Sequence, residues 1–204
     1  MRKLQDNEVL IHPHDHKNLK DWQRIFNLLD KNLNIREINS FLELGAGMGN
    51  LGYFILKRNS FCQVICEDIN PKYLKIISQR NNKIKTILHD INQPLPFEDK
   101  SFDLVSCVGT LHYAYVRNPE RALKEMVRLS KEYILVDFFP KYSFWALLER
   151  IFRPHYNPRR YNLIQILRLL RKLNLKEVAK IGTRTIFPKL FPFSGKTILF
   201  LLRK

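Results

Sequence analysis

Three glycines in alternation constrain the fold of this chain more than any other feature. They stand in the run FLELGAGMGN at residues 41–50, directly after a short apolar stretch. Glycine has no Cβ and tolerates positive φ, so the chain can turn sharply there and let a ligand touch the backbone. Between a buried strand and a helix, such a turn builds the floor of a site for a nucleotide-like cofactor.

Apolar residues around this loop follow the spacing of strands and helices in alternation. The strands are expected at residues 38–44, 63–67, 84–88, 102–108 and 133–138, and the helices at 18–33, 50–58, from 71 onward and at 118–129. Asn70-Pro71 and Asn118-Pro119 mark two helix starts, because proline fits the first turn of a helix. An alternation of this kind predicts a parallel sheet with helices on both faces.

The last third of the chain breaks this alternation. Residues 143–152 and 161–173 have helical spacing, and two more strands are expected at 177–185 and 196–201. Only a loop joins these strands, so they should pair antiparallel. We therefore expect one α/β domain over residues 1–204, with a mostly parallel sheet of seven strands that ends in an antiparallel pair. Its expected parts are a helical N-terminal cap (1–37), a core (38–138), a helical insert (139–174) and the strand pair (175–204).

Composition is typical of a globular protein inside the cell. Of the 204 residues, 45% are hydrophobic, yet no apolar run reaches the roughly 18 residues that a transmembrane helix needs. The N-terminus lacks the apolar centre of a signal peptide. Cys62, Cys66 and Cys107 are odd in number and lie in apolar runs, which indicates buried, reduced thiols. We expect a cytoplasmic protein.

Positive charge is concentrated toward the C-terminus. The formal net charge is +16, and residues 151–204 hold thirteen Lys and Arg against a single acid, Glu177. A basic face of this kind attracts nucleic acid, anionic lipid or an anionic metabolite, and it also serves as a solubilising surface. The sequence leaves these interpretations open.

Two cofactors compete for the glycine loop. The run GMGNLG at residues 47–52 satisfies the dinucleotide fingerprint G-x-G-x-x-G, a weak match on its own. The run ELGAGMG at residues 43–49 resembles the first motif of the class I S-adenosylmethionine-dependent methyltransferases. Glu43 separates the two, because a carboxylate at the strand end suits the cationic methionyl part of S-adenosylmethionine and repels an anionic pyrophosphate. We expect a Rossmann-like methyltransferase fold.

Further segments resemble the same family, most closely its type 11 methyltransferase domain. The run VICEDINP (64–71) resembles the second strand, whose terminal acid, here Asp68 with Glu67 as the alternative, binds both ribose hydroxyls. The run HDIN (89–92) resembles the adenine site, and LPFEDKSFDLV (95–105) is the most specific match. The resemblance covers residues 41–138. The cofactor-binding residues that it implies are Glu43, Gly45, Ala46, Gly47, Asn50, Asp68, Ile69, Asp90, Ile91 and Cys107.

Two segments depart from the family pattern. Ser130-Lys131-Glu132 forms the expected turn where relatives often have Pro-Gly-Gly before the fifth strand. Asn174 stands where a glycine commonly precedes the sixth strand, and asparagine tolerates the left-handed conformation. Both segments lie away from the expected cofactor floor, so they bear on the subfamily and not on the cofactor.

The fourth strand leads into GTLHY at residues 109–113, which the resemblance places beside the transferred methyl group. Alignment of the reactants can supply most of the catalysis, and a base is needed only when the acceptor must lose a proton. An unperturbed imidazole titrates near neutrality, so His112 is the candidate base or positioning residue; the alternative is a histidine bonded to a neighbouring loop. Thr110, His112, Tyr113 and Trp145 form the candidate acceptor pocket, although loop tyrosines also serve as plain packing.

The helical insert is aromatic and basic, and relatives often build an acceptor lid there. Such a lid suits a small-molecule or lipid-like acceptor with an anionic group, or the surface of an anionic membrane; the alternative is ordinary packing with solvated arginines. The expected function is methyl transfer from S-adenosylmethionine to such an acceptor. An RNA methyltransferase that holds phosphates with its basic C-terminal third, and a non-catalytic partner protein that binds S-adenosylmethionine, are the alternatives.

Histidines alternate near the N-terminus, at His12, His14 and His16. On a strand they would share one face and could bind a metal there. A flexible N-terminal lid or tail is the favoured interpretation, and no metal is expected.

Overall fold

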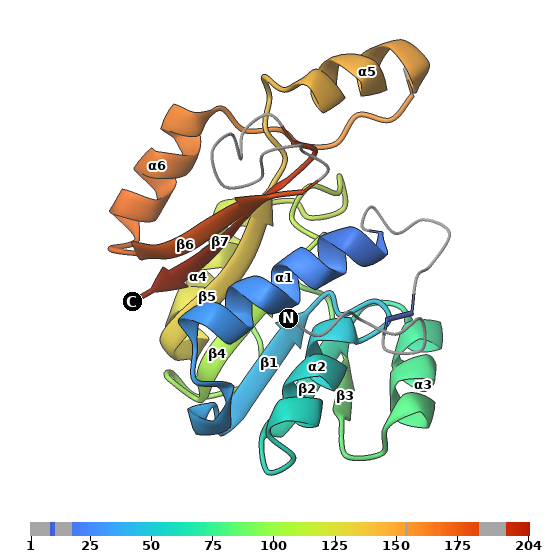
Figure 1. Ribbon diagram of the computed structural model, residues 1–204, viewed down its shortest axis with the longest axis vertical. Coiled ribbons are helices and arrows are strands. Elements are labelled where there is room, and N and C mark those ends of the chain that lie inside the picture. The colour runs from blue at the N-terminus through green and yellow to red at the C-terminus, as the bar shows by residue number, and fades with distance from the viewer. Residues whose placement is uncertain (1–8, 11–17, 154, 184–194) are drawn as a thin grey trace.

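A mixed sheet forms the centre of the molecule (Figure 1). The structure is a computed structural model that describes residues 9–10, 18–153, 155–183 and 195–204. Within them the sheet has seven strands in the order β3-β2-β1-β4-β5-β7-β6. The strands are β1 (Ser40–Leu44), β2 (Gln63–Asp68), β3 (Lys85–Leu88), β4 (Phe102–Cys107), β5 (Ser130–Phe138), β6 (Lys176–Gly182) and β7 (Ile198–Arg203).

Strand directions follow the sequence-based expectation. Strands β1 to β5 pair in parallel, and β7 runs antiparallel to both β5 and β6. The chain winds from β1 toward β3 on one side, then returns to place β4 against the other edge of β1. The order of the parallel strands therefore reverses between β1 and β4, and open parallel sheets bind their ligands at such a point.

Helices cover both faces of the sheet, as the strand–helix alternation predicts. The helices α1 (Leu19–Asn32), α2 (Asn50–Arg58) and α3 (Pro71–Arg80) bury apolar side chains in one core. The helices α4 (Pro119–Leu129) and α6 (Leu163–Lys172) do so in a second core. A short 3-10 helix, η2 (Ile35–Glu37), precedes β1. The helix α5 (Phe144–Phe152) lies beyond the carboxyl ends of the parallel strands, away from both cores (Figure 1).

Asparagine side chains cap several helices. Asn70 accepts a hydrogen bond from the backbone of Lys72 at the start of α3, and Asn118 accepts one from Arg121 at the start of α4. An N-cap asparagine satisfies a backbone N–H that has no partner inside the helix. The two helix starts expected at Asn-Pro pairs are therefore confirmed.

The expected turn at Ser130-Lys131-Glu132 is wrong, because β5 already begins at Ser130. Ser130 pairs with Phe102, and a bulge between Phe102 and Leu104 absorbs the offset to the regular pairing of Leu104 with Tyr133. A bulge places one extra residue in a strand, so apolar spacing alone misses the start. Asn174 takes the left-handed conformation that was expected, with a φ of 53°.

The three cysteines are free and buried, as expected. Residues 184–185 of the expected 177–185 strand, and the histidines His12, His14 and His16, lie outside the described residues. In the part of the chain that the structure describes, no helix has the length and apolar character needed to span a bilayer.

Candidate functional site

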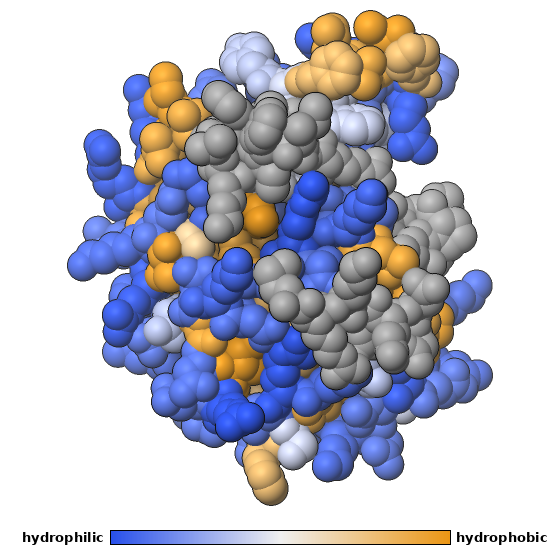
Figure 2. Space-filling view, viewed as in Figure 1, coloured by the Kyte–Doolittle hydropathy of each residue, from blue (hydrophilic) through white to orange (hydrophobic). Residues whose placement is uncertain are grey.

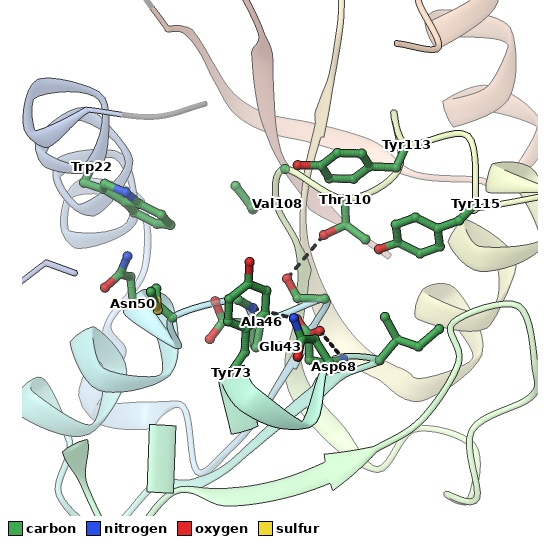
Figure 3. A pocket seen from close by; sticks show the side chains of 16 residues that line it. Trp22, Glu43, Ala46, Asn50, Asp68, Tyr73, Val108, Thr110, Tyr113 and Tyr115 are labelled. Atoms are coloured by element: carbon green, nitrogen blue, oxygen red, sulfur yellow. Dashed lines mark hydrogen bonds between the residues drawn. The ribbon is translucent and has the colours of Figure 1, made fainter. Parts of the chain in front are cut away.

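A cavity opens at the carboxyl ends of β1, β2 and β4, where the sheet order reverses (Figure 3). Its volume is ≈ 270 Å³, close to the lower end of the usual range for small-molecule sites. The glycine loop after β1 forms part of its lining, together with residues from α1, the start of α3 and the loop after β4. The expected edge of the sheet therefore holds the cavity.

The glycine loop needs its glycines for two different reasons. Gly45 has a φ of 60°, and a Cβ there would lie 2.3 Å from Oγ1 of Thr110. The Thr110 hydroxyl donates to the Gly45 carbonyl at 3.2 Å, which joins the loops after β1 and β4. Gly47 has a φ of 54°, and a Cβ there would meet nothing within 4 Å. Because Gly47 lines the cavity, its bare backbone leaves room for a ligand.

Two acids at the end of β2 hold this loop by its backbone. The Glu67 carboxylate accepts from Gly45 N–H at 3.0 Å, and the Asp68 carboxylate accepts from Gly47 N–H at 2.8 Å. Burial raises the pKa of Glu67 to about 8, although the bond from Gly45 opposes the shift. The other oxygen of Glu67 is buried without a hydrogen-bond partner among the described residues. Asp68 lines the cavity and Glu67 does not, which favours Asp68 as the acid that faces a ligand.

Glu43 combines a structural bond with a place in the cavity lining. Its carboxylate accepts from the backbone of Gly52 at 2.9 Å, near the start of α2, where the N-cap residue Gly49 has no side chain to do so. The thiol of Cys66 donates to the same oxygen at 3.4 Å. Glu43 is 4% exposed, and burial raises its pKa to about 7 against the lowering effect of these bonds. A cation in the cavity would favour the ionised form.

Asn50 ties the N-terminal segment to the cavity wall. Its side-chain amide accepts from Leu10 N–H at 3.0 Å and donates to the Leu10 carbonyl at 2.9 Å. Arg80 donates to the Asn50 oxygen at 2.9 Å and to the Met48 carbonyl at 3.2 Å. Asn50 lines the cavity, but these contacts engage its amide with the protein itself.

Aromatic side chains form the walls. Trp22 comes from α1 and Tyr73 from α3, while Tyr113 and Tyr115 come from the loop after β4 (Figure 3). The rings of Tyr113 and Tyr115 stack with centroids 5.7 Å apart. Sequence reasoning missed Trp22 and Tyr73 as site residues. The apolar spacing of α1 predicts Trp22 only as core, but Tyr73 follows Asp68 by little more than a helical turn, and that spacing was a usable signal.

His112 is buried and does not line the cavity. Its ring stacks on Phe139 with centroids 4.0 Å apart and lies 4.2 Å from the ring of Tyr113. Its backbone carbonyl accepts from Arg159 N–H at 2.8 Å, which joins the loop after β4 to the helical insert. His112 thus lies behind Tyr113, in contact with a residue of the cavity wall.

Several other candidate residues lie outside the cavity lining. Asp90 accepts from the backbone and side chain of Asn92, and the former bond is the main cause of its lowered pKa. Ile91 and Cys107 are buried in the core on the far face of the sheet from α1. Trp145 lines a separate hollow beside α1 with Asn18, Lys20, Asp21 and Arg24. The structure therefore brings Glu43, Gly45, Ala46, Gly47, Asn50, Asp68, Ile69, Thr110 and Tyr113 together at the cavity.

The charge of the lining has one sign. Glu43 and Asp68 are its ionisable acids, and no Lys or Arg belongs to the lining among the described residues. Such a surface attracts a cationic ligand and disfavours a pyrophosphate.

Comparison with known proteins agrees with this geometry. Residues 42–133 match a family described as a methyltransferase domain. No curated protein matches the sequence. The magnesium protoporphyrin IX methyltransferase of Synechocystis PCC 6803 with bound S-adenosylhomocysteine is 16% identical, with a TM-score of 0.72, over 91% of this chain and 82% of that one.

Two further solved structures share the fold. A methyltransferase of Thermotoga maritima, described as a possible histamine N-methyltransferase, is 20% identical with a TM-score of 0.65, over 90% of this chain and 89% of that one. The [4+2]-cyclase SpnF is 15% identical with a TM-score of 0.69, over 94% of this chain and 84% of that one. The fold is that of the class I S-adenosylmethionine-dependent methyltransferases, and residues 42–133 match the methyltransferase domain family.

Proposed function

We propose that this protein transfers a methyl group from S-adenosylmethionine to a small-molecule or lipid-like acceptor. The observation that carries the proposal is the cavity itself. Its floor is an open glycine backbone, and its ionisable residues are acids without a lining cation among the described residues. S-adenosylmethionine carries an ammonium and a sulfonium and no phosphate, so this charge fits it and opposes a dinucleotide.

The residues of the cavity divide the binding of the cofactor among them. Asp68 presents a carboxylate that can accept from both ribose hydroxyls, and it can do so while Gly47 N–H holds it in place. Glu43 offers negative charge toward the ammonium end. Ile69 lies next to Asp68 in the lining and gives the apolar contact that an adenine needs.

Asp90 and Ile91 remain our candidates for the far edge of the adenine. They stand outside the cavity lining, but Asn92, which bonds Asp90, also donates to the Tyr115 carbonyl at 2.9 Å. This bond joins the loop after β3 to a loop that does line the cavity.

When bound, S-adenosylmethionine supplies a methyl group on a sulfonium, which is already a good leaving group. The protein then has to hold the acceptor atom in line with the methyl carbon and exclude water. Thr110 and Tyr113 stand at the wall where an acceptor would enter, and His112 packs against Tyr113 from behind. We assign His112 the role of positioning Tyr113, with proton removal as the alternative.

The aromatic walls favour a small or lipid-like acceptor. Trp22, Tyr73, Tyr113 and Tyr115 offer apolar faces with polar tips, which suit a flat or apolar body with a few polar groups. The insert arginines Arg159 and Arg160 are engaged within the protein, since Arg159 donates to the Val116 carbonyl and Arg160 binds Glu149.

Calorimetry tests the cofactor assignment. Titration with S-adenosylmethionine should give heat, and NAD should give none; the opposite result would overturn the proposal. Asp68→Asn should weaken binding of S-adenosylmethionine by about tenfold or more, because a charge-assisted bond to a diol is lost. Asp99→Asn on an exposed turn is the matched control and should bind as the wild type does.

Labelled S-adenosylmethionine tests the acceptor class. The protein is incubated with it and with fractionated cell extract, and label should appear in small molecules or lipids. The basic C-terminal third favours RNA as the second candidate, and label in RNA would replace the first proposal with that one. Binding of the cofactor without label in any fraction would support a non-catalytic partner protein or, as in a fold that also hosts a cyclase, a different reaction.

A further inference from the structure

The helix α5 presents its apolar side to solvent. Its apolar residues recur at helical spacing and form one stripe, which we call the outer stripe: Phe144, Leu147, Leu148, Ile151 and Phe152. Exposure of Phe144, Leu147, Ile151 and Phe152 ranges from 55% at Leu147 to 75% at Phe152. Figure 2 shows these residues as a hydrophobic patch at the top of the molecule. An amphipathic helix of a globular protein normally turns such a stripe toward the core.

Buried ion pairs hold the opposite side of α5 against the protein. Glu149 is 6% exposed, and its carboxylate binds Arg160 at 2.5 Å and Lys196 at 2.8 Å. Burial disfavours its charged form, yet these two cations hold the pKa of Glu149 below its ordinary value. Ala146, one turn earlier, is buried on the same side. The helix is thus fixed by charges on its inner side, and that attachment leaves the outer stripe exposed.

Exposed cations accompany the outer stripe along the chain. Lys141 precedes α5, Arg150 lies within it and Arg153 is its C-cap, and all three are exposed. Between residues 138 and 176 the sequence has one acid, and that acid is Glu149, which is buried and paired. The exposed surface of this segment therefore combines apolar side chains with cations and contains no exposed carboxylate among the described residues.

This combination selects one kind of partner. A second copy of the chain would bring the Arg150 and Arg153 side chains of both copies together, and like charges oppose that contact. Nucleic acid would leave the aliphatic residues Leu147 and Ile151 in water, because phosphates and bases offer them little. An anionic lipid surface accepts both features, since apolar side chains enter the acyl boundary while cations meet the headgroups.

We propose that α5 docks the protein on the surface of a membrane that contains anionic lipid. The outer stripe enters the headgroup region, and Lys141, Arg150 and Arg153 contact the lipid phosphates. The insert that carries α5 also bonds the loop after β4, through Arg159 N–H to the His112 carbonyl. Docking therefore holds the loop after β4, which carries Tyr113 and Tyr115 of the cavity wall, close to the lipid surface. The docking surface is independent of the methyl-transfer chemistry, because no residue of the outer stripe lines the cavity.

Vesicle sedimentation without S-adenosylmethionine tests the proposal. The wild type should bind vesicles of phosphatidylcholine mixed with phosphatidylglycerol, and it should bind pure phosphatidylcholine much less. Phe144→Ser combined with Phe152→Ser should lower the partition coefficient by about tenfold or more for each phenylalanine. Phe61→Ser is the matched control, because Phe61 is 92% exposed in the turn between α2 and β2, and it should bind as the wild type does.

Two double variants with the same change in net charge test the role of the cations. Arg150→Glu with Arg153→Glu should lower binding by about fivefold or more for each position. Lys75→Glu with Lys83→Glu makes the same change in net charge on the α3 side and should have a small effect. Binding of the wild type should also weaken as salt is added.

Four results would overturn the proposal. They are absence of vesicle binding, equal binding to neutral and anionic vesicles, equal loss in the test and control variants, and wild-type binding by the Phe144→Ser, Phe152→Ser double variant. A self-association that this double variant abolishes would assign the outer stripe to a second copy instead. RNA binding that only the arginine variant loses, with no vesicle binding, would assign the surface to nucleic acid.

Discussion

Glu43 should make the stability and the cofactor affinity of this protein depend on pH in opposite directions. Burial raises the pKa of this carboxyl from its ordinary 4.5 to about 7. Between these two values the folded protein holds a proton that the unfolded chain has released, so stability falls as pH rises through the window. Once the pH exceeds the pKa of Glu43 in the folded protein, the stability lost through this carboxyl is about 3 kcal/mol.

Glu43→Gln removes this titration while an amide oxygen remains to accept from Gly52. Unfolding of the cofactor-free wild type and variant is followed by denaturant from about pH 5 to about pH 8, and the variant should gain about 3 kcal/mol relative to the wild type across that range. Glu67, with its pKa raised to about 8, adds its own slope to both proteins and cancels in the difference. Glu98→Gln, at an exposed position, is the control. Its free energy of unfolding should depend on pH as that of the wild type does.

Affinity for S-adenosylmethionine should move the other way. A cationic ligand needs Glu43 ionised, so wild-type affinity should rise by about tenfold from about pH 6 to about pH 8, and Glu43→Gln should flatten that rise. Parallel stability curves for wild type and variant would refute the burial argument. An unchanged pH dependence of binding in the variant would refute the assignment of Glu43 to the ammonium end.

Three further predictions follow from the site and its surroundings. His112→Phe keeps a ring stacked on Phe139 and should retain methyl transfer. His112→Ala should destabilise the fold by about 3 kcal/mol, because the ring is lost from a buried site. If the phenylalanine variant unfolds normally but loses turnover, His112 is the base. Gly47→Ala should weaken cofactor binding strongly, as measured by calorimetry, because the new methyl group would occupy the open floor of the cavity. It should cost only about 1–2 kcal/mol of stability in unfolding experiments, since that methyl group meets no protein atom within 4 Å. Cofactor binding equal to that of the wild type would refute the open floor. Lys196→Met should lower the free energy of unfolding by about 3–5 kcal/mol, because it leaves Glu149 buried with one partner fewer. Adding Glu149→Gln to this variant should restore part of the lost stability in unfolding experiments. Additive losses from the two substitutions would contradict the ion-pair argument.

The sequence predicts most of the sheet and the floor of the site, because both depend on local patterns. Glycines that need positive φ, the acid at the end of a strand and the Asn-Pro helix starts are set by neighbours along the chain. These patterns predict Glu43, Gly47 and Asp68 as site residues, and the structure places all three in the lining of one cavity.

What the sequence misses depends on contacts between distant residues. Trp22 has the spacing of a core residue, and only the packing of α1 beside the glycine loop brings it to the cavity wall. The apolar spacing of α5 shows that the helix is amphipathic but not which way it faces. Its orientation is set by Glu149, whose partners Arg160 and Lys196 lie 11 and 47 positions away in the sequence. Likewise, the start of β5 depends on a bulge against β4.

The position of β7 in the sheet has a consequence for synthesis of the protein. This strand follows the other six described strands in the sequence, yet it fills the gap between β5 and β6, and five of its six residues are buried. Until it leaves the ribosome, the nascent chain has an open edge on β5 and no strand to which β6 can pair. Unpaired edges of this kind invite pairing with other chains. Completion of the sheet is therefore postponed until β7 has been synthesised, and a stop codon before Ile198 should give an aggregating product rather than a smaller folded one.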